Sequence, residues 1–126
     1  MKRIKTACII ASSLLVIIAL FHGSGINYVS ELVENSDADD LIKSIFPVLF
    51  ILPTLQLLGL AIFGWVATTL KHQANKILIP LSLLVLADAL LAFYLNATVP
   101  GIILLIPAAL FMLSAYTNSK QQPAQE

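Results

Sequence analysis

The stretch that decides the fold class is ILIPLSLLVLADALLAFYL, residues 77–95. As an α-helix it would be about 28 Å long, close to the roughly 30 Å hydrocarbon core of a bilayer. One acid, Asp88, lies near its middle. Because an acid that faces lipid at this depth costs about 2.5 kcal/mol or more, we expect Asp88 to be protonated and to point into a helical bundle.

The composition of the whole chain is that of a membrane protein. Of its 126 residues, 59% are hydrophobic and 11% are charged, against about 45–50% and 25% in soluble domains. We therefore expect an all-α integral membrane protein, a four-transmembrane-helix bundle with spans at about residues 6–22, 45–70, 77–95 and 101–117. These spans form one domain, residues 1–117. Residues 118–126 are polar and are expected to be a disordered cytoplasmic tail.

The first apolar segment has two interpretations. Ala7, Ala11 and Ser12 are small enough for close packing against other helices, which favours a retained span. Small residues at 23–25 also suit a signal-peptidase site, so a cleaved signal peptide is the alternative. The charge pattern fits both, because cleavage would leave three spans in the same orientation.

The loop after the first span is acidic. Ile26, Val29 and Val33 share one face of a helix, which predicts a short interfacial helix in this first outer loop. The candidate outer-face site for a cation or a basic partner consists of His22, Glu31, Glu34, Asp37, Asp39 and Asp40. A solvated acidic surface is the simpler interpretation. The loop lacks the turn glycine of an EF-hand, and its spacing fixes no metal geometry.

Basic residues indicate the topology. Six of the seven lie at the two ends of the chain or in residues 71–76, on one side of a four-span protein, and only Lys43 lies on the other. The positive-inside rule then places both termini in the cytoplasm. We expect a multi-pass protein of the cytoplasmic (inner) membrane, in a bacterium.

Gln56 is the expected partner of Asp88. The short polar turn at residues 71–76 makes the second and third spans antiparallel neighbours, and counting from that turn puts Gln56 at a similar depth to Asp88. The acid could donate to the Gln56 carbonyl or to the Leu49 carbonyl, which Pro53 deprives of its amide donor. The residues expected to allow close helix packing here are Pro53, Gly59, Ala89 and Ala92. A stripe at helical spacing, Gln56, Gly59, Phe63 and Ala67, predicts the packing face of the second span.

Three uses of this buried pair remain open: an interhelical hydrogen bond without further function, a proton or cation relay, and a docking point for a basic residue of a larger complex. No phosphate loop, nucleophile elbow or zinc-binding helix motif occurs in the sequence. The single cysteine, Cys8, excludes an internal disulfide, and no basic patch suits nucleic acid.

These observations favour a small non-enzymatic membrane protein without cofactor or metal, acting as an accessory or interaction component of a membrane complex. One alternative is a small oligomeric transporter or channel that uses Asp88 as its proton or ion site. Another is a lipid- or quinone-binding enzyme subunit. The expected partners are membrane lipid and either further copies of the chain or a larger membrane-protein complex, and not nucleic acid.

Overall fold

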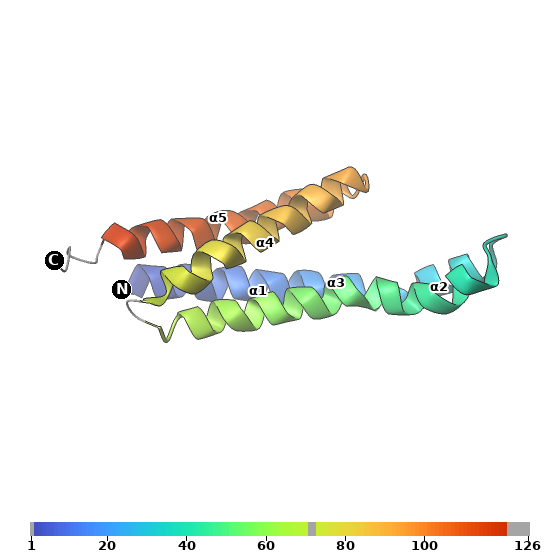
Figure 1. Cartoon of the computed structure of the whole chain (residues 1–126), viewed down its shortest axis with the longest axis horizontal. Helices are drawn as coiled ribbons and strands as arrows, with labels where there is room; N and C mark the ends of the chain where they lie inside the picture. The colour runs from blue at the N-terminus through green and yellow to red at the C-terminus, as the bar shows by residue number, and fades with distance from the viewer. Residues whose placement is uncertain (1, 71–72, 121–126) are drawn as a thin grey trace.

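The computed structural model describes residues 2–70 and 73–120, and this part of the chain folds into helices joined by short turns (Figure 1). The helices are α1 (Lys2–Ser24), α2 (Ile26–Glu34), α3 (Asp40–Ala67), α4 (Asn75–Tyr94) and α5 (Thr98–Lys120). With α1 and α2 counted together, four helices are long and apolar enough to cross a membrane. The predicted all-α architecture with four apolar helices is confirmed for the described residues.

The bundle consists of two antiparallel hairpins. In the first, α1 and α2 pack along α3, and in the second α4 packs along α5. The hairpins meet where α1 contacts α5 and α3 contacts α4. They lie close together where α1 begins and α5 ends, and they diverge toward the α4–α5 turn (Figure 1). We call these two ends the closed end and the open end.

Small side chains form the core near the closed end. On α1, residues at heptad-like spacing are almost completely buried: Ile4, Cys8, Ala11, Ser12, Leu15 and Ala19. Gly64 on α3 lies so near the facing helices that a Cβ atom there would come within 2.8 Å of the Phe111 ring and would also meet Ser12. A full face of α1 is therefore buried in the bundle, and whether this first segment is retained or cleaved stays a prediction.

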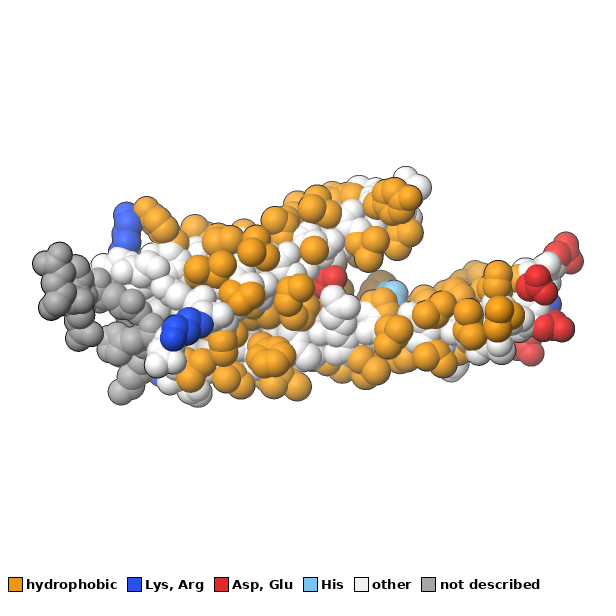
Figure 2. Space-filling view, in the orientation of Figure 1, with side chains coloured by type: hydrophobic (Ala, Val, Ile, Leu, Met, Phe, Trp, Pro, Cys, Tyr) orange, Lys and Arg blue, Asp and Glu red, His pale blue; other side chains and the backbone are white. Residues whose placement is uncertain are grey.

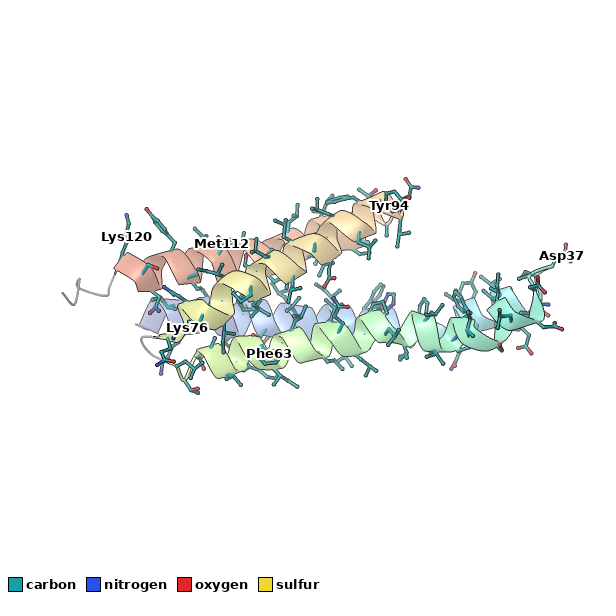
Figure 3. All side chains as sticks on the ribbon, in the orientation of Figure 1. Asp37, Phe63, Lys76, Tyr94, Met112 and Lys120 are labelled. Atoms are coloured by element: carbon teal, nitrogen blue, oxygen red, sulfur yellow. The ribbon has the colours of Figure 1, made fainter. Side chains whose placement is uncertain are left out.

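The first hairpin is longer than the second and extends beyond it at the open end. Asp37 lies at the tip of this overhang, well past Tyr94 at the end of α4 (Figure 3). The helix expected at residues 26–33 does form, as α2, but it follows α1 after a break at Gly25 and packs on α3. Its placement at a membrane surface stays a prediction.

The predicted disorder of the C-terminal tail is wrong for residues 118–120, which belong to α5. The reason is a polar cluster at the closed end. Asn75 on α4 donates a hydrogen bond to Ser119 at 2.6 Å, and Asn118 donates to Asn75 at 3.0 Å. These bonds hold the last turn of α5 against the start of α4. Residues 121–126 of the predicted tail lie outside the described residues.

Candidate functional site

A cleft lies between the two hairpins where they diverge. Its volume is about 400 Å³, within the roughly 300–1,000 Å³ of small-molecule sites. The space-filling view shows the hollow from the side (Figure 2). Most of its lining is apolar, including Ile18, Phe21, Leu91, Leu95 and Leu104. Three polar side chains complete the wall: His22 from α1, Gln56 from α3 and Asp88 from α4.

Gln56 and Asp88 are in direct contact. The Gln56 amide nitrogen donates a hydrogen bond of 2.7 Å to Oδ1 of Asp88 and so joins α3 to α4. This contact agrees with the depth counted from the sequence, although the glutamine donates where the acid was expected to donate. The other carboxyl oxygen, Oδ2, is buried and has no hydrogen-bond partner within the described part of the chain. The functional use of the pair stays a prediction.

His22 joins α1 to α3 beside the cleft. Its Nε2 atom lies 3.1 Å from the carbonyl oxygen of Phe50, and its ring stacks on the Phe50 ring with 4.5 Å between centroids. Because a carbonyl oxygen only accepts, Nε2 must carry the hydrogen, and Nδ1 of the neutral ring is then an acceptor.

The hydrogen bond to the Phe50 carbonyl lies next to the position where the sequence predicted an unpaired carbonyl because of Pro53. Pro53 disturbs the helix turn that contains the carbonyls of Leu49 and Phe50, since it has no amide hydrogen and its ring crowds the preceding turn. A neighbouring helix was expected to compensate at Leu49. The structure instead shows a side-chain bond to the adjacent carbonyl, that of Phe50, and its donor is His22. Sequence reasoning missed this contact, because His22 alone resembles an ordinary residue at the end of a span.

The predicted outer-face cation site is not assembled. In residues 2–70 and 73–120, no group of three or more His, Cys, Asp or Glu side chains could hold a metal ion. His22 lies in the cleft, whereas the acids gather at the tip of the overhang (Figure 2). The acids in question are all exposed: Glu31, Glu34, Asp37, Asp39 and Asp40. Docking of a basic partner on this tip stays a prediction.

The packing face predicted for α3 is wrong at Gly59 and Phe63, whereas Ala67 is buried as expected. A Cβ atom at Gly59 would meet nothing within 4 Å, and Phe63 is 56% exposed. The observed face is rotated by about one residue and contains Leu57, Leu60, Ala61 and Gly64. Of the other residues expected to allow close packing, Ala89 is fully buried, while Pro53 and Ala92 line the cleft.

Comparison of the chain with protein-family models, with curated proteins and with solved structures finds no match. The functional conclusions therefore rest on the geometry of the cleft. Its described lining contains one acid and one histidine and neither lysine nor arginine. Such a site can hold an apolar molecule and form hydrogen bonds with one polar group.

Proposed function

We propose that the protein is a small non-enzymatic membrane component that binds an amphiphilic ligand, an apolar body with one polar group, in the cleft between its hairpins. The observation that carries this proposal is the cavity of about 400 Å³ with apolar walls and three polar side chains from three helices. Cavities of this kind are the default location of ligand sites. Because the hairpins diverge, the cleft is open along its side, where a lipid-like molecule could enter from the bilayer.

The ligand proposal is tested by filling the cleft. Ala92 lines it, so Ala92→Phe should occupy part of its volume, whereas Ala87→Phe on the same helix adds the same ring at an exposed position outside it. We expect native mass spectrometry of protein extracted in mild detergent to detect a bound lipid-like molecule in the wild type and in Ala87→Phe. The adduct should be lost in Ala92→Phe. Equal retention by all three proteins would contradict the proposal.

The membrane placement belongs to the same proposal. The two basic ends of the chain and residues 71–76 would lie in the cytoplasm and the acidic tip outside, across a bacterial cytoplasmic membrane. In this placement α2 reaches the outer membrane surface. An impermeant thiol reagent added to whole cells should label Asp37→Cys and leave Lys120→Cys unlabelled, both in a Cys8→Ser background. The reverse pattern would invert the topology.

A second candidate function, an accessory component of a membrane complex, is favoured by the overhang. Leu41 and Ile42 are 69% and 49% exposed on a part of α3 that extends beyond α4 and α5. A photoreactive amino acid at position 41 should crosslink to a protein, either a second copy or a different chain. Crosslinks to lipid alone would count against this function.

The transporter alternative has less support from the packing. Leu15, Val85 and Phe111 are fully buried on the closed-end side of Asp88, so an ion path through one copy would have to cross this layer. An oligomer could provide another path that uses Asp88. Flux through reconstituted protein that is unchanged by Asp88→Asn would exclude that path.

A further inference from the structure

We infer that the cleft selects a lipid whose head is an uncharged hydroxyl group, held by His22 and the Gln56–Asp88 pair, which line the same cleft. This inference rests on the proposed function, because it names the class of ligand for the same cleft. Three observations carry it: the charge of the lining, its hydrogen-bonding capacity, and the two interhelical contacts that fix its polar groups.

The charge of the lining disfavours an anionic head. Asp88 is the one acid among the described lining residues, and no lysine or arginine accompanies it. A phosphate or carboxylate head would enter an apolar space without a compensating cation, and an ammonium head would find no counter-ion there, because Asp88 is expected to be protonated at this depth. Burial of an unpaired charge is strongly unfavourable. Fatty acids and phospholipid headgroups are therefore poor ligands for this cleft.

The hydrogen-bonding capacity favours a head that donates. His22 uses Nε2 on the Phe50 carbonyl, which leaves Nδ1 as an acceptor. Gln56 donates one N–H to Asp88 and keeps its carbonyl oxygen as a further acceptor. A hydroxyl group donates one hydrogen bond and accepts others, so it matches both this surplus of acceptors and the remaining N–H of Gln56.

The polar groups are also held in place before a ligand arrives. Stacking on Phe50 orients the His22 ring, and the 2.7 Å bond to Gln56 orients the Asp88 carboxyl group. Groups that are already fixed lose little conformational freedom when a ligand binds. The difference in hydrogen bonding between two ligand heads should therefore appear in full as a difference in affinity. A ligand that lacks the donor would cover the Nδ1 and Gln56 acceptors without giving them a hydrogen bond.

Four ligands with the same chain test the inference: tetradecanol, its methyl ether, tetradecanoate and tetradecylammonium. Their affinities would be measured by competition with a diazirine-bearing tetradecanol in phosphatidylcholine nanodiscs, and the crosslinked residues would be mapped by peptide mass spectrometry. We expect crosslinks on cleft residues such as Leu91 and Leu95. The alcohol should bind about tenfold more tightly than the ether, and both charged ligands more weakly than the alcohol.

Two variants assign the preference to the cleft. His22→Phe keeps an aromatic ring for stacking and removes both Nδ1 and the Nε2 bond to Phe50, and Asp88→Leu removes the carboxyl group. Each should bind the ether as the wild type does and lose most of the preference for the alcohol. Thr117→Val is the control, because Thr117 bonds to the carbonyl of Leu113 on its own helix, away from the cleft, and it should keep the full preference.

The outcomes separate the inference from the proposed function. Cleft crosslinks with equal affinity for alcohol and ether, or with tighter binding of either charged ligand, would overturn the hydroxyl inference and leave the ligand site standing. Crosslinks that spread over exposed positions such as Leu83 and Leu113, with no competition by any of the four ligands, would overturn both. An alcohol preference that both variants retain would also overturn the inference.

Discussion

The closed end and the open end of the bundle are built from the same helices and differ in how completely their side chains are buried. On α1, Ala11 and Leu15 are completely buried near the closed end, whereas Phe21 is 81% exposed near the open end. At the closed end, small residues such as Ser12 and Gly64 let the helices approach closely. At the open end the hairpins diverge around the cleft. The comparison teaches that stability and ligand binding can depend on different halves of this molecule, and substitutions can test that separation.

The largest effect on stability is expected at Phe111, which is completely buried in the closed half. Phe111→Ala should lower the free energy of unfolding by about 3–5 kcal/mol, because the ring leaves a cavity that the neighbouring helices fill only in part. Unfolding by sodium dodecyl sulfate in mixed micelles would measure the change. Phe63→Ala is the matched control at a 56% exposed position on α3, and an equal loss there would contradict a core confined to the closed half.

A smaller effect is expected at Gly64. Its missing side chain admits Ser12 and the Phe111 ring, so Gly64→Ala should cost about 1–3 kcal/mol through overpacking. Gly59→Ala makes the same change five residues away, where a Cβ atom meets nothing within 4 Å. That variant should leave the free energy of unfolding unchanged or raise it by up to about 1 kcal/mol, since alanine favours the helix. The difference between the two alanine variants locates the close contact.

His22 lies at the boundary between the two halves. His22→Leu should cost about 1–2 kcal/mol in the same assay, because the Phe50 carbonyl loses its hydrogen-bond donor and Phe50 loses its stacking partner. His22→Gln keeps a donor on a side chain of similar reach and should recover part of this loss. No difference between Leu and Gln at this position would mean that the hydrogen bond contributes nothing to the junction of α1 and α3.

The smallest effect is expected for the Gln56–Asp88 pair in the open half. A double-mutant cycle with Gln56→Leu and Asp88→Leu should give a coupling energy below about 1 kcal/mol, the usual range for interhelical hydrogen bonds in membranes. Because Oδ2 of Asp88 is buried without a partner, Asp88→Leu alone should change stability little. A coupling energy of several kcal/mol would instead make the pair a major structural contact. It would contradict the proposal that stability depends mainly on the closed half.

Hydropathy and charge were sufficient to predict the four apolar helices and the short turn between α3 and α4. The Gln56–Asp88 contact also followed from the sequence, because an antiparallel turn fixes the relative depth of two adjacent helices. The prediction that Gly59 allows close packing was wrong because apolar spans carry no polar face to reveal their rotation. An error of one residue turns a helix by about 100°. The contact of His22 with Phe50 depends on the packing of α1 against α3, which local spacing does not specify.

The unequal length of the hairpins has a consequence for the surrounding bilayer. α4 has 20 residues and is about 30 Å long, whereas α3 has 28 residues and is about 42 Å long. A bilayer that matches α4 would be too thin for α3, so lipids on the two sides of the protein would have to adopt different thickness, or the longer hairpin would have to tilt. Hydrophobic mismatch would then be greatest beside the cleft, and bilayers of graded acyl-chain length would change the tilt of the first hairpin more than that of the second.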